Sequence, residues 1–276
     1  MKRAAAFAIL LGAACNTDAA APHLARGNVL VNNGHKEEAA VEYREAARLA
    51  PKSALARERL GDTLYDLGRL DDALAAYREA AALSTESAFT ARVGAARVLE
   101  EKGDLLAARA ELTQGIEKAP TNLFLLLSRG NLAAKSGDKK AALADAERAV
   151  HLKSDNVPAL YQYGVALLDD GQVPQAGATF DRLLQVAPKS PEGYYGRARY
   201  FAARGEGAFA AEALAAAGKL VESDARARLE EQGLKGPALD KAAHEAAGKS
   251  LAGMQHDPAF ARWAHDPGFR RGADWP

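Results

Sequence analysis

The chain has 276 residues, of which 48% are hydrophobic, 26% charged and only 7% aromatic. This composition is typical of a folded globular chain and excludes a long disordered tract. The 36 basic side chains balance the 36 acidic ones, so neither composition nor charge indicates a nucleic-acid-binding protein.

Residues 1–14 have the pattern of an export signal. Lys2 and Arg3 precede an apolar run from Ala4 to Ala14, which is too short to span a bilayer permanently. The run ends in Gly12-Ala13-Ala14, directly before the single cysteine, Cys15. This junction resembles the bacterial lipobox, which implies that Cys15 is lipidated. The alternative interpretation is an unmodified thiol beside an ordinary cleavage site.

The lipobox resemblance implies a location for the mature chain. Residues 15–19 would form the lipidated cysteine and a short tether, and Asn16 in place of aspartate implies delivery to the outer membrane, facing the periplasm. A chain with one cysteine forms no internal disulfide. We therefore expect a lipid-anchored protein of the bacterial cell envelope.

Six glycines recur every 34 or 35 residues, and an alanine follows each of them five positions later. Glycine accepts the positive φ that ends a helix, so each is expected in a turn between two helices. The turn glycines are Gly34, Gly68, Gly103, Gly137, Gly171 and Gly205. They predict six helical hairpins over residues 20–53, 54–87, 89–122, 123–156, 157–190 and 191–224.

Other positions recur with the glycines. The first unit reads Gly27, Leu30, Gly34, Ala39, Tyr43, Ala46 and Pro51. This pattern resembles the tetratricopeptide repeat. The resemblance implies an all-α, right-handed superhelical solenoid of about six hairpins that acts as a protein-binding scaffold. It implies no catalytic activity, cofactor or small-molecule substrate.

Some repeat positions are interpreted through packing. Gly27, Gly61, Gly130 and Gly164 lie within predicted helices, where glycine costs about 1 kcal/mol relative to alanine. We expect the close approach of a second helix to offset this cost, with Ala39, Ala73, Ala142 and Ala176 facing the glycines. The third unit has Ala96 at the glycine position and Leu112 at the aromatic position, and the fourth unit has Ala146 at the aromatic position. We therefore expect these two units to pack more loosely than their neighbours.

In the family that the chain resembles, the first helix of each hairpin lines a concave groove for a partner. The candidates are Asn28, Asn32, Asp62, Tyr65, Asp66, Arg97, Phe124, Asn131, Tyr161, Tyr195 and Arg199, with Leu24, Val31, Leu55, Glu58, Leu127, Leu168 and Asp169 at equivalent positions. Amides of this set suit an extended peptide, and its aromatic rings suit anchoring contacts. The alternative interpretation is that the rings only pack between repeats. Members of this family that bind chaperones hold the C-terminal carboxylate of the chaperone with a lysine and an asparagine. Leu24 and Leu127 stand at the lysine position here, so we do not expect the chain to bind chaperone C-termini.

Residues 225–276 leave the repeat and are predicted to form a helical cap. A helix is expected from Ala238 to Met254. Asp257 and Asp266 then precede prolines and are expected to cap two short helices, with Phe260, Trp263 and Phe269 covering the last hairpin. His256 and His265 lack further ligands for a metal site. No nucleophile elbow, metalloprotease spacing or phosphate-binding loop occurs, so no catalytic or metal residues are assigned.

The leading functional hypothesis is a scaffold or assembly adaptor that binds a protein or peptide partner. By architecture, a six-repeat lipoprotein resembles the pilotins that assist secretin assembly in type IV pili. An adaptor for peptidoglycan enzymes is a second hypothesis. A third is a soluble enzyme accessory in which Cys15 carries no lipid.

Overall fold

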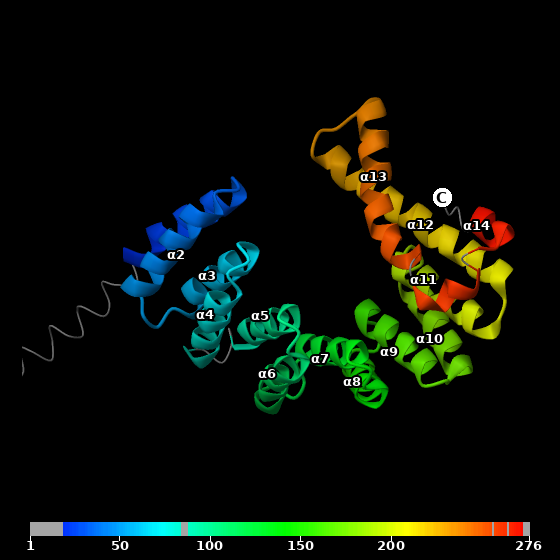
Figure 1. Ribbon diagram of the computed structural model, residues 1–276, viewed down its shortest axis with the longest axis horizontal. Coiled ribbons are helices and arrows are strands. Elements are labelled where there is room, and N and C mark those ends of the chain that lie inside the picture. Colours follow the sequence, from blue (N-terminus) through cyan, green and yellow to red (C-terminus); the bar gives the residue numbers. More distant parts are fainter. Residues whose placement is uncertain (1–18, 84–87, 256, 264, 273–276) are drawn as a thin grey trace, which may run out of the picture. The chain divides into compact units, whose positions relative to one another are not determined.

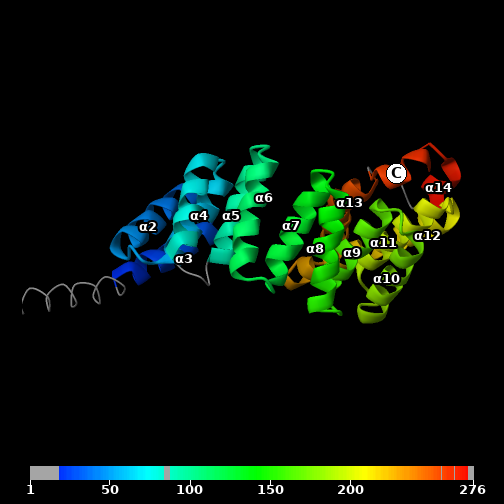
Figure 2. The same ribbon diagram turned by 90° about the horizontal axis from the view of Figure 1, so that it is seen from below.

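The computed structural model describes residues 19–83, 88–255, 257–263 and 265–272 (Figures 1 and 2). All regular structure in these residues is helical and they contain no strand, which confirms the predicted all-α fold. The predicted signal peptide and Cys15 lie outside the described residues. The chain divides between Leu132 and Ala133 into two compact units, called unit 1 and unit 2.

Unit 1 consists of consecutive helices, most of which pack against the next one along the chain (Figure 1). They are a first helix over residues 19–32, α2 (Lys36–Leu49), α3 (Ala54–Asp66), α4 (Leu70–Leu83), α5 (Ala88–Glu101), α6 (Leu105–Lys118) and most of α7 (Leu123–Lys135).

Unit 2 continues the pattern with α8 (Lys139–Leu152), α9 (Val157–Asp169), α10 (Val173–Val186), α11 (Pro191–Arg204) and α12 (Gly207–Glu231). The tail then adds α13 (Gly236–Gln255), the 3-10 helix η1 (Pro258–Trp263) and α14 (Pro267–Gly272).

The turn glycines have the conformation that the sequence predicts. Their φ angles lie between 72° at Gly68 and 83° at Gly205, in the left-handed region that favours glycine. At the first turn, Gly34 N–H donates to the Val31 carbonyl at 3.0 Å and His35 N–H donates to the Leu30 carbonyl at 2.8 Å. These two bonds satisfy carbonyl groups that the end of the helix leaves open. The turn is therefore set by local chemistry.

Side-chain caps start several of the helices. The carboxylates of Asp104 and Asp138 accept the Ala107 and Ala141 N–H groups at 3.0 and 3.1 Å. Asp71 lies in the first turn of α4, where a negative charge is favourable.

Aromatic rings, and not alanines, explain the glycines within the helices. A methyl group on Gly61 would lie 2.9 Å from the Tyr77 ring, and one on Gly94 would lie 2.5 Å from it. In unit 2, Gly164 and Gly196 bracket Phe180 in the same way, at 2.5 and 2.3 Å. At Gly27, Gly61 and Gly164 the nearest neighbours are therefore ring atoms, and not the predicted Ala39, Ala73 and Ala176. Each ring lies between the first helices of two successive hairpins.

The third hairpin is well packed, contrary to the prediction of loose packing. Leu112 is buried at the aromatic position and belongs to one continuous core with Val98, Ile116 and Leu125. Ala96, at the position where other units have glycine, is also buried. Ala146 of the fourth hairpin is also buried.

The tail of unit 2 forms the predicted cap. Helix α12 has 25 residues and continues past residue 224, where the sequence ended the last hairpin, and α13 packs along it. Asp257 and Asp266 cap η1 and α14, as predicted. Phe260 and Phe269 are buried against α11 and α12. Figure 2 gives a second view of this cap. None of the described helices has an apolar stretch long enough to cross a membrane.

Candidate functional site

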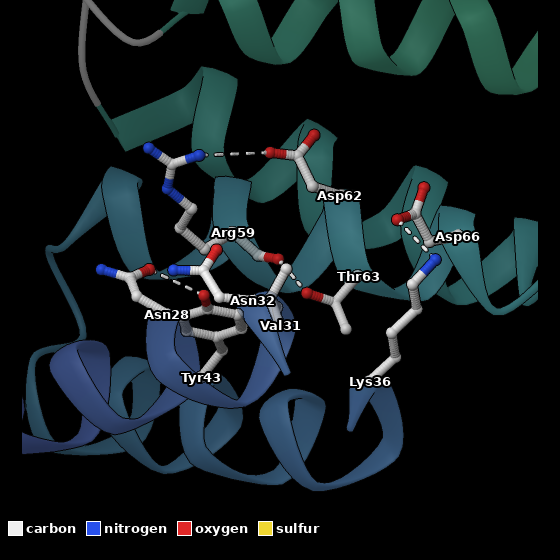
Figure 3. Close-up of a pocket in the computed structure, with 9 residues that line it drawn as sticks. All are labelled: Asn28, Val31, Asn32, Lys36, Tyr43, Arg59, Asp62, Thr63 and Asp66. Carbon is white, nitrogen blue, oxygen red and sulfur yellow. Dashed lines mark hydrogen bonds and ion pairs between the residues drawn. The ribbon is translucent and has the colours of Figure 1, made fainter. Parts of the chain in front are cut away.

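Unit 1 contains an open pocket between the first helix, α2 and α3 (Figure 3). Its volume is about 390 Å³. Most of the side chains around it are polar. The lining residues are Asn28, Val31, Asn32, Lys36, Tyr43, Arg59, Asp62, Thr63 and Asp66. Four of the eleven predicted groove residues, Asn28, Asn32, Asp62 and Asp66, thus lie around one pocket, which we call the unit 1 groove.

Helices α2 and α4, the second helices of the first two hairpins, each place a tyrosine hydroxyl against a side chain of this groove. The Tyr43 hydroxyl donates to Asn28 Oδ1 at 2.7 Å, and the Tyr77 hydroxyl donates to Asp62 Oδ1 at 2.6 Å. Both rings are buried, because the glycines beside them let the rings lie against helix backbone. Each tyrosine therefore fixes the orientation of a groove side chain 15 residues before it.

Burial and the Asp62 carboxylate affect the Tyr77 hydroxyl together. Desolvation is the larger cause and the hydrogen bond to Asp62 the second, and both raise the pKa of Tyr77 well above its ordinary value. Tyr77 therefore stays protonated and remains a hydrogen-bond donor at physiological pH.

The charges of the unit 1 groove balance. Lys36 Nζ lies 3.0 Å from Asp66 Oδ2, and an Arg59 guanidinium nitrogen lies 3.8 Å from Asp62 Oδ2. These exposed pairs contribute little to stability. Their effect is electrostatic neutrality, so the groove favours a neutral, polar ligand over a highly charged one.

The two asparagines retain hydrogen-bonding capacity. Because Asn28 Oδ1 accepts from Tyr43, the Asn28 amide nitrogen is left as a donor without a hydrogen-bond partner among the described residues. Asn32 lies one helical turn further and its amide has no hydrogen-bond partner in the part of the chain that the structure describes. Two side-chain amides, which both donate and accept, thus lie on one helix face.

A second group of predicted residues extends the groove toward α5. The Arg97 guanidinium lies 4.1 Å from the centre of the Tyr65 ring, within cation-π distance. It also donates to the Tyr77 hydroxyl at 3.3 Å and lies 3.9 Å from Asp62 Oδ1. The structure therefore brings Asp62, Tyr65 and Arg97 into one cluster.

The predicted residues of α7 are accessible. The Phe124 side chain is 53% exposed, so the alternative interpretation as a core residue is wrong for this ring. Asn131 is exposed on the same helix. The structure gives neither residue a role in the unit 1 groove.

In unit 2, the predicted groove residues face the tail of the chain. Tyr161 and Tyr195 stack with their centres 6.4 Å apart. Tyr195 donates to Asp257 Oδ2 at 2.5 Å, and Arg199 Nε lies 3.4 Å from the same oxygen. Desolvation, followed by the bond to Asp257, raises the pKa of Tyr195 above its ordinary value.

Several groove residues escaped the sequence prediction. Tyr43 is identified from the sequence only as a recurring position of the repeat, although its 15-residue separation from Asn28 is the same as that of Tyr77 from Asp62. Lys36, Arg59 and Thr63 lie outside the positions carried over from the family resemblance. No group of three or more potential ligands is arranged to hold a metal within the described residues. His256 lies outside them, and His265 is exposed.

Comparison with known proteins agrees with this architecture. A family model described as tetratricopeptide repeat matches residues 24–88, 59–122 and 127–191, which together make up more than half of the chain. No curated protein matches the chain in sequence.

Solved structures show the same fold. A tetratricopeptide repeat protein from Parabacteroides merdae is 17% identical with a TM-score of 0.62, and the match covers 93% of this chain and 98% of that one. PilF of Pseudomonas aeruginosa is 17% identical with a TM-score of 0.58, covering 72% and 90%. YrrB is 24% identical with a TM-score of 0.50, covering 70% and 98%. The chain thus belongs to the tetratricopeptide repeat family, whose hairpins form scaffolds for protein–protein interaction and are typically non-catalytic.

Proposed function

We propose that the chain is a non-enzymatic scaffold that holds an extended segment of a protein partner in the unit 1 groove. The observation that carries this proposal is the pair of amides, Asn28 and Asn32, one turn apart beside a groove of balanced charge. An amide side chain can pair with both the N–H and the C=O of a peptide unit. Tyr43 holds Asn28 in place, which lowers the entropic cost of binding.

The peptide proposal fits the chemistry better than a charged ligand does. Lys36 and Arg59 are offset by Asp66 and Asp62, so neither a free phosphate nor a cation finds an unpaired charge in the groove. YrrB, which shares the fold, has been described as a repeat protein with an unusual peptide-binding site. That description adds support for a peptide ligand.

The test is site-specific photocrosslinking in cells. A photoreactive residue at position 32 is expected to capture a partner, whereas one at Val41 of the same unit, which is 61% exposed and does not line the groove, is the matched control. The adduct at position 32 should disappear when Asn28 is replaced by alanine. Equal capture at both positions, or capture that survives Asn28→Ala, would contradict binding in the groove.

We further propose that Cys15 is lipidated and anchors the scaffold to the outer membrane, facing the periplasm. The support is the apolar segment that ends in Gly12-Ala13-Ala14 before the single cysteine. Metabolic labelling with a fatty-acid analogue is expected to mark the native chain and to fail for Cys15→Ser. A mature chain found free in the periplasm and unaffected by globomycin would contradict anchoring and favour the soluble accessory.

Within this framework, we propose assistance to secretin assembly in type IV pili as the pathway, with peptidoglycan enzymes as the alternative partners. The shared fold with PilF is consistent with the first proposal. Deletion of the gene should reduce secretin multimers and surface pili. If both are unchanged, and hydrolases or synthases are recovered with the Asn32 crosslink, the second partner class is correct.

A further inference from the structure

The tail of the chain covers the groove face of α11. Asp257 Oδ2 accepts from the Tyr195 hydroxyl at 2.5 Å and lies 3.4 Å from Arg199 Nε. Tyr195 and Arg199 lie one turn apart and both were predicted to contact a partner. Their side chains and that of Asp257 are largely buried in this arrangement. A carboxylate therefore fills the position that the sequence assigns to a partner.

An aromatic ring follows the carboxylate by three residues. Phe260 is fully buried, with its ring centre 6.1 Å from that of Tyr195, among Ala198 and Ala202 of α11 and residues of α12. Asp257 Oδ1 accepts the Ala259 N–H at 2.8 Å. The same carboxylate thus binds the groove with one oxygen and fixes the turn that delivers the ring with the other.

The tail contains the same Asp-Pro-x-Phe pattern a second time, and this copy serves as an internal comparison. Asp266 caps its turn through the Phe269 N–H at 2.7 Å, and Phe269 packs on Phe260. However, Asp266 has no arginine or tyrosine partner within the described residues. The contacts to the Asp257 carboxylate therefore depend on Tyr195 and Arg199 of α11, since the Asp-Pro-x-Phe pattern forms its turn without such contacts at Asp266.

Room for a longer ligand lies beside the occupied face. A pocket of about 760 Å³ in unit 2 is bounded by Tyr161 and Tyr195 on one side and by Val221 and Met254 on the other. Apolar walls with a few polar groups are typical of pockets that accept a side chain. A peptide bound on α11 could therefore extend past the segment that the tail supplies.

We propose that the α11 face is a second peptide-binding site, which accepts a partner segment with a carboxylate followed three residues later by phenylalanine. Residues 257–263 are its competitor in the same chain. A tethered segment acts at an effective concentration in the millimolar range, so a partner must displace it. This inference goes beyond the unit 1 groove, because it concerns unit 2 and other side chains.

The experiment titrates an acetylated, fluorescent peptide of sequence DPAFARW, identical to residues 257–263, into the full chain. Fluorescence anisotropy should show at least about tenfold tighter binding to Phe260→Ala than to the native chain, because the variant loses its internal competitor. A peptide with asparagine in place of aspartate should bind on the order of tenfold more weakly. In the Phe260→Ala background, Arg199→Gln should make the acidic and amide peptides bind alike.

Two further variants make the test decisive. Asp257→Asn keeps Phe260 in the core and removes only the charge, so it should also bind the peptide more tightly than the native chain does. Equal binding to the native chain and to both open variants would overturn the inference, as would equal binding of the acidic and amide peptides to folded Phe260→Ala. Asn28→Ala with Asn32→Ala should leave peptide binding unchanged. Loss of binding there would place the peptide in the unit 1 groove and overturn this inference while supporting the proposed function.

Discussion

The two units use the same repeat position in different ways. In unit 1 the second helices carry Tyr43 and Tyr77, whereas unit 2 carries Phe180 at the equivalent position. All three rings pack against helix glycines. Only the tyrosines have a hydroxyl that continues past the glycine and bonds a groove side chain. The tyrosine hydroxyl is therefore present in unit 1, where the groove is polar, and absent in unit 2, where the groove is aromatic.

The units differ as well in what covers their grooves. The unit 1 groove is lined by amides and balanced ion pairs, which water can solvate. In unit 2 the rings of Tyr161, Phe180 and Tyr195 lie together, and the tail covers their edge with Phe260. Because exposed apolar surface is unfavourable in water, an aromatic groove gains stability from a cover that a polar groove does not need.

The largest expected effect comes from removing that cover. Phe260→Ala should lower the free energy of unfolding by about 4 kcal/mol, the range for deleting a buried phenylalanine. Phe209→Ala is the matched control, because this ring is 56% exposed in α12; we expect a loss below about 1 kcal/mol. Urea denaturation followed by circular dichroism measures both. Similar losses for the two variants would show that the cover of unit 2 is not a stabilising element.

The stability of unit 1 depends on a buried ion pair between α5 and α6, and not on an aromatic cover. Arg92 donates to Glu111 Oε2 at 3.0 Å, Arg78 donates to Oε1 at 2.7 Å, and Arg92 and Glu111 are both buried. Glu111→Ala should cost about 3 kcal/mol, because Arg92 is left as a buried charge without its carboxylate. Replacing both residues, Arg92→Met with Glu111→Leu, should recover most of this loss in the same denaturation experiment. A double variant less stable than Glu111→Ala would contradict this account.

The features that the sequence predicted correctly depend on local chemistry. Gly34 and Gly205 terminate helices because positive φ is easy only for glycine, and Asp266 caps a helix through the N–H of Phe269, three residues further along the chain. The burial of Phe260 was also predictable, because a terminal hairpin must cover its apolar side.

The features that the sequence did not reveal depend on contacts between distant residues. Tyr195 and Asp257 are 62 residues apart, and their meeting depends on the path of α12 and α13. The role of Tyr77 required knowledge that Gly94 of the next hairpin lies against its ring. The buried bond between Arg92 and Glu111 likewise joins residues 19 positions apart on two helices.

The glycines beside the rings give a smaller effect that tests the shared architecture. Gly94→Ala places a methyl group 2.5 Å from the Tyr77 ring. The overlap should cost more than the roughly 1 kcal/mol that alanine gains in a helix, which leaves a net loss of about 1 to 2 kcal/mol. Gly248→Ala in α13 meets no atom within 4 Å and should instead stabilise the chain. Thermal unfolding distinguishes the two signs, and a stabilising Gly94→Ala would contradict the packing account.

The smallest effect concerns a property that the two units share. Tyr77 in unit 1 and Tyr195 in unit 2 both donate to carboxylates, Asp62 and Asp257, and the pKa of each tyrosine is raised, chiefly by burial. Above about pH 10 the unfolded chain loses the phenolic proton while the folded chain keeps it. The stabilisation is therefore complete below that pH and declines as the pH rises, by at most about 1.4 kcal/mol per pH unit for each tyrosine.

Single replacements show which unit causes the loss of unfolding free energy at alkaline pH. Tyr77→Phe and Tyr195→Phe should each reduce the dependence of unfolding free energy on pH in the alkaline range, measured by urea denaturation at a series of pH values. Tyr200→Phe is the control, because the Tyr200 hydroxyl is held by an exposed arginine, Arg204, and not by a carboxylate. A reduction for Tyr77→Phe without one for Tyr195→Phe would mean that the tail uncovers Tyr195 in solution, because only a solvent-exposed tyrosine without the Asp257 bond would titrate alike in the folded and unfolded chains. That outcome would extend the contrast between the units to their tyrosines and would show that the tail releases the α11 face without a partner.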